Sequence, residues 1–307
     1  MLTRRDLLVA ATGAVVAGCS RRESASRAPS ASPLASTSAS PLGSSRARVV
    51  AWDIDGVFGA DRAVLVVPTA TPSAGFPLLV ALHGRGEAVK SPAEGALGWP
   101  RDYALLRAID RVSEPPLVAA DYEGLVDPAR LARTNVELTA HPYGGLVIAC
   151  PHIPDLAPNG DDVPAVGRFL VDGLVARCRR EIQVCTASTG IDGVSMGGAL
   201  ALRVGLSHPE VFNAVGALQA AIAMEHVEEL TELARAARAK RPSLKLRLLT
   251  SSGDMFRDAI VELSRAWRAA GIAHDFADVP GPHDYVFNRG PGSIELLTWH
   301  DRALRES

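Results

Sequence analysis

A serine set among closely spaced glycines is the strongest chemical signal in this sequence. The motif Gly193-Val194-Ser195-Met196-Gly197 follows a short apolar run and precedes a helical pattern that opens with small residues. A sharp strand-to-helix turn lifts a serine oxygen clear of a sheet and tolerates only small neighbours. The helix N-terminus then offers unpaired N–H groups and partial positive charge where an oxyanion would form. We therefore predict that Ser195 is a nucleophile; an inert serine in a tight turn is the alternative.

A serine nucleophile needs a general base and a carboxylate that orients the base. Among the 8 histidines, only His283 lies in a loop marked by Gly and Pro directly after the last strand candidate. Two acids compete for the third position. Asp254 follows a strand candidate in a Gly-Asp turn, whereas Asp258 falls in the first turn of a helix, where acidic residues are common because of the helix dipole. We prefer Asp254 and keep Asp258 as the alternative.

Short apolar runs and longer helical patterns must position these side chains. The strand candidates are 49–54, 63–67, 78–82, 146–150, 191–194, 215–218, 246–250 and 276–279. The helix candidates are 163–177, 198–207, 227–239, 256–270 and 293–304. The first two strands are close enough for a hairpin, and the later alternation predicts an α/β fold with a mostly parallel sheet covered by helices on both faces. Sites in such sheets lie at the carboxyl ends of the strands.

Three segments carry a family resemblance: Gly-Val-Ser-Met-Gly-Gly around Ser195, Leu-His-Gly-Arg-Gly at 82–86, and Gly-Pro-His-Asp-Tyr at 281–285. Together they resemble the esterase D-like branch of the α/β-hydrolase superfamily over residues 47–307. The resemblance implies a central eight-stranded sheet, hydrolysis of carboxylic esters through an acyl-enzyme, and no cofactor.

The same resemblance assigns two further roles. It implies an oxyanion hole formed by the backbone amides of Arg85 and Met196. The order Ser195, Asp254, His283 also matches the α/β-hydrolase pattern, in which the histidine comes last. We therefore interpret His83, which precedes the serine, as a residue that shapes its loop.

The predicted function is a serine hydrolase acting on a small-molecule or acyl-ester substrate. Acyl transfer or peptidase chemistry with the same triad is the nearer alternative, and a non-catalytic binding lipoprotein on a hydrolase scaffold is the more distant one. The net charge of −2 argues against a nucleic-acid partner. The sequence contains no His-Glu-x-x-His motif and no phosphate-binding Gly-rich motif, so we predict no metal.

The segment 87–145 is longer than a connection between neighbouring strands requires. It contains Trp99, Tyr103, Tyr122 and Tyr143. Two interpretations stay open: a cap or pocket wall that selects the substrate, or packing on the sheet edge.

The N-terminus resembles a bacterial export signal. A basic start with Arg4 and Arg5, similar to the twin-arginine motif, is followed by an apolar run that ends in Val-Ala-Gly-Cys at Cys19. We predict a signal peptide over 1–19 with lipid attached to Cys19, a disordered Ser/Ala/Pro-rich linker over 20–46, and a catalytic domain over 47–307. The chain would be exported, by the Tat route, and lipid-anchored to the extracytoplasmic face of a membrane.

Three cysteines remain in the catalytic domain: Cys150, Cys178 and Cys185. Export would place them in an oxidising compartment. Cys178 and Cys185 lie close together in the sequence, and we predict a disulfide between them; three small buried hydrophobic side chains are the alternative.

Overall fold

The computed structural model describes residues 44, 46–70 and 75–305. The predicted signal peptide, with Cys19, and most of the predicted linker lie outside the described residues. The described residues belong to one compact unit, and the first strand of this unit begins at Ala47. In these ranges no helix is long and apolar enough to cross a bilayer.

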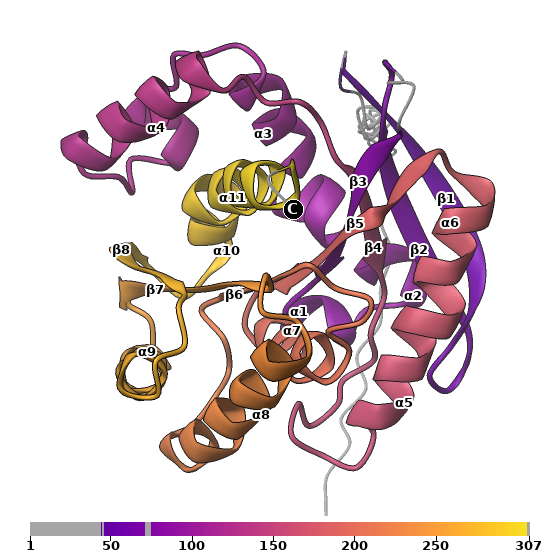
Figure 1. Ribbon diagram of the computed structural model, residues 1–307. Helices are drawn as coiled ribbons and strands as arrows, with labels where there is room; N and C mark the ends of the chain where they lie inside the picture. Colours follow the sequence, from indigo (N-terminus) through magenta and orange to yellow (C-terminus); the bar gives the residue numbers. More distant parts are fainter. Residues whose placement is uncertain (1–43, 45, 71–74, 306–307) are drawn as a thin grey trace, which may run out of the picture. The chain divides into compact units, whose positions relative to one another are not determined.

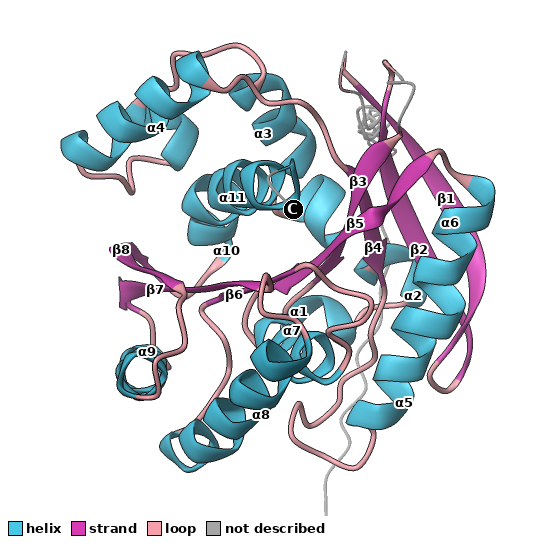
Figure 2. Ribbon diagram, viewed as in Figure 1, coloured by secondary structure: helices cyan, strands magenta, loops and turns pink. Residues whose placement is uncertain are grey.

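A single eight-stranded sheet runs through the unit (Figure 2). The strand order is β1-β2-β4-β3-β5-β6-β7-β8. Strands β1 and β2 form an antiparallel hairpin, β2 also pairs antiparallel with β4, and every later pair is parallel. The bounds are β1 (Ala47–Gly56), β2 (Gly59–Pro68), β3 (Phe76–Leu82), β4 (Val147–Pro151), β5 (Val184–Gly193), β6 (Ala214–Leu218), β7 (Lys245–Gly253) and β8 (Asp275–Pro282).

The central strands consist almost entirely of apolar residues because both of their faces are covered. Every residue of β3, β4 and β6 is buried. Parallel strands with helices on each side have no wet face, so their sequences do not alternate between apolar and polar residues. The predicted α/β class and the eight-stranded, mostly parallel sheet are confirmed.

Helices cover the sheet in two layers (Figure 1). One face carries α5 (Val163–Arg168), η3 (Phe169–Val175), α6 (Ala176–Glu181), α7 (Met196–Ser207), α8 (Val227–Lys240) and α9 (Arg257–Ala269). The other carries α3 (Leu105–Val112) and α11 (Ser293–Arg305), with α4 (Pro128–Ala140) beyond them. The shorter helices are α1 (Arg85–Ala88), α2 (Pro92–Gly95), η1 (Gly98–Asp102), η2 (Ala119–Tyr122), η4 (Met224–His226), α10 (Tyr285–Phe287) and η5 (Asn288–Gly292).

Each face of the sheet has its own apolar core. One core joins alternate strand residues to α7, α8 and α9, with Trp267 and Phe212 among its largest buried side chains. The second joins the opposite strand residues to α3 and α11. This division follows from the strand repeat, because successive side chains point to opposite faces.

The long segment 87–145 contributes to the second core. Trp99, Tyr103 and Tyr122 are almost completely buried there, and α3 packs against α11. A largely buried ion pair reinforces this packing: Arg130 reaches Glu295 of α11 at 2.7 Å. The arrangement supports the interpretation of the segment as packing, because three of its four aromatic side chains named above face the interior.

The predicted disulfide between Cys178 and Cys185 is wrong: both cysteines are free. Cys178 lies on α6 with its side chain in the first core, and burial raises the pKa of its thiol to about 12. Cys185 lies near the start of β5, where its Sγ is 3.8 Å from the hydroxyl of Ser188. Nearness in sequence did not bring the thiols together, because the helix side chain points into the core. Cys150 is also free and buried.

Candidate active site

Ser195 occupies a strained turn between β5 and α7. Its backbone has φ 58° and ψ −119°, a region that side-chain-bearing residues rarely adopt. Two backbone bonds hold the turn: the Ser195 N–H donates to the carbonyl of Leu218 at 3.0 Å, and its carbonyl accepts from the N–H of Ala221 at 2.9 Å. The end of β6 therefore fixes the serine at the carboxyl edge of the sheet.

The turn requires glycine two positions before and two positions after Ser195. A Cβ on Gly197 would lie 2.4 Å from the carbonyl oxygen of His83, and one on Gly193 would lie 2.4 Å from the backbone of Gly197. Both distances are far inside van der Waals contact. The first turn of α7 consequently packs directly against the end of β3, and the Gly-x-Ser-x-Gly pattern has a steric cause.

The structure brings Ser195, His283 and Asp254 together from three loops. The Nε2 atom of His283 is 3.0 Å from the Ser195 Oγ, and its Nδ1 atom is 2.8 Å from Oδ1 of Asp254. A carboxylate can only accept, so the Nδ1–H donates to Asp254 and Nε2 is left free to accept the serine proton. These are the distances that a base needs toward its nucleophile and toward the group that orients it.

Asp254 is fixed as firmly as the serine. Its side chain is buried, Oδ2 accepts the Thr250 hydroxyl at 2.8 Å, and Oδ1 also accepts the N–H of Phe256 at 3.0 Å. The ring of Phe256 meets the His283 ring edge-on at 5.4 Å. Asp258, the alternative acid, has a side chain 95% exposed and faces Arg257 instead.

Gln219 ties the histidine loop to the sheet. Its Nε2 donates to the Ser251 hydroxyl at 2.6 Å and to the Pro282 carbonyl at 2.9 Å, one residue before His283. Ser251 in turn donates to the carbonyl of Gly281 at 2.7 Å. This buried amide therefore connects β6, β7 and the histidine loop. Sequence reasoning missed it, because a glutamine after an apolar run has no motif of its own.

Two backbone amides are available beside the serine. Arg85 and Met196 are the first residues of α1 and α7, so neither N–H has an acceptor within its own helix. The neighbouring amide of Gly84 differs, because it donates to the Tyr103 hydroxyl at 3.1 Å. The Arg85 side chain points outward and pairs with Asp155 at 2.8 Å. No backbone hydrogen bond from either amide is found among the described residues, and their role as oxyanion donors stays a prediction.

His83 lies behind the site, within the protein. Its Nε2 accepts the N–H of Ile153 at 3.0 Å, so its Nδ1 carries the proton and donates to the Gly84 carbonyl at 2.9 Å. Burial lowers the pKa of the His83 ring to about 4. A neutral ring with both nitrogens occupied holds the loop, as the interpretation from the sequence proposed.

Exposed apolar side chains gather in the loops at the catalytic edge of the sheet. Val89 follows β3, Met224 follows β6, Met255 follows β7, and Tyr285 follows β8. The carboxyl ends of parallel strands share one edge, so these loops lie at the edge of the sheet that carries Ser195. We call these four residues the apolar rim.

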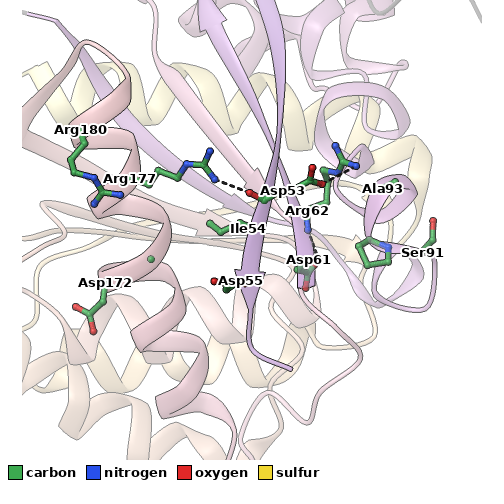
Figure 3. A pocket seen from close by; sticks show the side chains of 12 residues that line it. Asp53, Ile54, Asp55, Asp61, Arg62, Ser91, Ala93, Asp172, Arg177 and Arg180 are labelled. Atoms are coloured by element: carbon green, nitrogen blue, oxygen red, sulfur yellow. Dashed lines mark hydrogen bonds and ion pairs between the residues drawn. The ribbon is translucent and has the colours of Figure 1, made fainter. Parts of the chain in front are cut away.

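A separate cavity of about 680 Å³ opens between the β1–β2 hairpin and the helical segment η3–α6 (Figure 3). Charged side chains of both signs line it, and Asp53 pairs with Arg62 at 3.0 Å. None of Ser195, Asp254 and His283 reaches it. Within the described ranges, no group of three or more His, Cys, Asp or Glu side chains is placed to hold a metal ion.

No protein-family model and no curated protein matches the chain. Several solved structures do. A ferulic acid esterase aligns with a TM-score of 0.63 at 16% identity over 84% of this chain and 99% of its own. The S-formylglutathione hydrolase of Staphylococcus aureus aligns with a TM-score of 0.57 at 13% identity over 84% and 98%. The feruloyl esterase module of Clostridium thermocellum aligns with a TM-score of 0.60 at 12% identity over 84% and 90%. The chain thus has the α/β-hydrolase fold.

Proposed function

We propose that this protein is a serine hydrolase that cleaves carboxylic esters through an acyl-enzyme. The observation that carries the proposal is the position of His283, whose two ring nitrogens lie 3.0 Å from Ser195 Oγ and 2.8 Å from Asp254 Oδ1. Added to the strained backbone of Ser195, this is the arrangement of an activated nucleophile. A non-catalytic binding protein on this scaffold has no need to preserve all three side chains in register.

The chemistry follows from the protonation states that the hydrogen bonds impose. As Ser195 Oγ attacks the ester carbonyl carbon, its proton passes to Nε2 of His283, and Asp254 stabilises the resulting imidazolium. The carbonyl oxygen becomes an oxyanion that accepts from the amides of Arg85 and Met196. The imidazolium then protonates the departing alcohol. Water, activated by the same base, attacks the acyl carbon and releases the carboxylic acid and Ser195.

The surroundings of the site support an uncharged substrate with apolar groups. The four side chains of the apolar rim carry no charge, and the Arg85 side chain is engaged with Asp155. The structurally similar enzymes are named for ferulic acid and for S-formylglutathione, which carry different acyl groups. Their names support acyl hydrolysis in general, and the acyl group that this protein prefers is to be determined by experiment.

A fluorophosphonate probe tests the proposal directly. Labelling of the purified protein at Ser195, located by mass spectrometry of peptides, is the expected result, together with hydrolysis of short-chain nitrophenyl esters. Ser195→Ala and His283→Ala should each lower kcat by about 10⁴-fold or more while the fold survives. Retained turnover in Ser195→Ala contradicts the proposal. Product analysis with alcohol acceptors and peptides separates hydrolysis from acyl transfer and peptidase activity.

We also propose that the chain is exported and anchored by lipid at Cys19. The support is the sequence alone: a basic start, an apolar run and small residues before the cysteine. In a bacterial host, Cys19→Ser should move the ester hydrolase activity from the membrane fraction to the soluble fraction and leave kcat/KM unchanged. Activity that stays with the membrane in the variant contradicts the anchor.

A further inference from the structure

Glu87 is a buried carboxylate that the proposed reaction does not use. It lies in α1, two residues after Arg85, and is 1% exposed. Its Oε2 accepts from the Tyr103 hydroxyl, and its Oε1 accepts from the Tyr285 hydroxyl at 2.5 Å. The ammonium of Lys90 lies 3.4 Å from Oε1. Burying a carboxylate costs free energy, so we expect Glu87 to have a role beyond packing.

The Tyr103 hydroxyl connects Glu87 to the loop that carries Arg85. It donates to Glu87 and at the same time accepts the N–H of Gly84 at 3.1 Å. Burial and the neighbouring Glu87 charge raise the pKa of Tyr103 well above its usual value, so the phenol keeps its proton. The bond holds the peptide between His83 and Gly84, which is next to the peptide that carries the Arg85 amide. It also occupies the Gly84 amide, so the Arg85 amide is the first in this loop that lacks an acceptor within its own helix.

The Tyr285 hydroxyl connects the same carboxylate to the loop of the base. Tyr285 stands two residues after His283, and its ring lies 5.7 Å from that of Tyr103. Its hydroxyl reaches over Gly86, where a Cβ would come within 2.9 Å of it. Burial and Glu87 raise the pKa of Tyr285 as well. One carboxylate therefore joins the oxyanion loop, the long segment 87–145 and the histidine loop.

We propose that Glu87 is a positioning residue which, through Tyr103 and Tyr285, holds the Arg85 amide and the His283 ring in register for the same tetrahedral intermediate. The proposal rests on the proposed function and adds residues that no motif assigns. The physical reason is that an oxyanion donor acts only when it points at the oxyanion before the reaction, since reorienting it during the reaction raises the barrier. Three hydrogen bonds to one buried carboxylate and its partner supply that rigidity.

The test uses Tyr285→Phe and Tyr103→Phe in the full chain, with Glu87→Gln as a third variant. Each phenylalanine keeps the ring and removes one hydroxyl. We expect kcat for a short nitrophenyl ester to fall about 10- to 100-fold, below the 10²–10³ found when an oxyanion donor is removed outright, while KM changes little. Affinity for a trifluoromethyl ketone, which forms a tetrahedral oxyanion adduct, should fall in parallel with kcat. Affinity for the product carboxylic acid should stay unchanged.

Glu94→Gln is the matched control. Glu94 lies on α2, pairs with Arg101 at 2.8 Å and has a side chain 55% exposed, so its kcat and ketone affinity should equal those of the unaltered protein. Tyr285 is 39% exposed, so Tyr285→Phe is the variant least prone to misfold. If the unaltered protein neither hydrolyses esters nor reacts with fluorophosphonate, the proposed function has failed. If it does both and Tyr285→Phe and Tyr103→Phe keep its kcat and ketone affinity, the positioning role is overturned while the function stands.

Discussion

Asp254 and Asp258 are four positions apart in the sequence but have opposite environments. Asp254 is enclosed and accepts from His283, Thr250 and a backbone amide, whereas Asp258 projects into solvent. Replacing Asp254 by Asn should lower kcat about 10²- to 10⁴-fold, because an amide can neither stabilise the imidazolium nor hold the same tautomer. Steady-state kinetics with circular dichroism as a check of folding measures this.

Asp258→Asn is the control for that variant and should leave kcat within about twofold, because exposed ion pairs contribute little. The opposite ranking of the two variants would transfer the role to Asp258. Their difference tests the assignment without assuming a substrate, since any hydrolysed ester reports it.

His83 gives the protein a pH-dependent stability that is separate from catalysis. Its pKa falls from about 6.5 in the unfolded chain to about 4 in the fold, because burial disfavours the imidazolium. Between these values the unfolded chain binds more protons than the folded one. Stability from this residue is therefore complete above pH 6.5 and is lost as the pH falls toward 4, by about 3 kcal/mol in all.

Urea unfolding at several pH values measures this contribution. In His83→Gln the free energy of unfolding should be lower at pH 7, and its difference from the unaltered protein should shrink as the pH falls from 6.5 to 4. A constant difference over that range would show that His83 is not buried in its neutral form. His300 and His274 also have lowered pKa values, so the comparison between the two proteins is the informative quantity.

At the scale of elements, the site depends on how closely α7 approaches β3. A methyl group on Gly197 would meet the carbonyl oxygens of His83 and Leu82 at 2.4 and 2.5 Å. Neither carbonyl can move freely, because both lie at the end of a central strand and its following loop. We predict that Gly197→Ala abolishes fluorophosphonate labelling and lowers the melting temperature.

Gly173→Ala is the matched change in another helix. Gly173 lies in η3, where a Cβ would contact only the Phe169 ring at 3.6 Å. This variant should retain labelling and be as stable as the unaltered protein or more so, since alanine favours a helix over glycine by about 1 kcal/mol. Equal behaviour of the two variants would contradict the close approach of α7 and β3. Differential scanning fluorimetry and gel-based labelling suffice for both.

Across the whole molecule, the features that could be predicted from the sequence are those that a local residue pattern determines. Apolar runs located all eight strands, and the signal was clearest for the central parallel strands, which are buried on both sides. The positions of Ser195 and His283 followed from glycine and proline at strand ends. Glu87 and Gln219 were missed because their partners are remote: Tyr285 lies 198 residues from Glu87. Such contacts depend on which loops meet at one sheet edge. The disulfide error has the same origin, since spacing does not reveal where a side chain points.

The long segment 87–145 has two interpretations, a packing element or a substrate-selecting cap, and its contacts with the rest of the fold bear on both. Its Tyr122 is buried in the second core, η2 contacts η5 next to α11, and the Tyr122 hydroxyl lies 3.4 Å from that of Thr134. A packing role predicts that Tyr122→Ala lowers the free energy of unfolding by about 3–5 kcal/mol, as loss of a buried aromatic ring does. It also predicts an unchanged ratio of kcat/KM between long and short acyl esters.

A selecting cap predicts the reverse, a changed ratio with little loss of stability. Val136→Ala on the exposed surface of α4 is the control and should alter neither quantity. The two readouts separate the interpretations because stability reports the core, whereas the ratio reports contacts made only by the substrate. Packing against α11 and the ion pair of Arg130 with Glu295 favour the first outcome. The buried part of the segment would then act on catalysis through Tyr103 and the loop that Tyr103 supports, by holding the oxyanion amide in place.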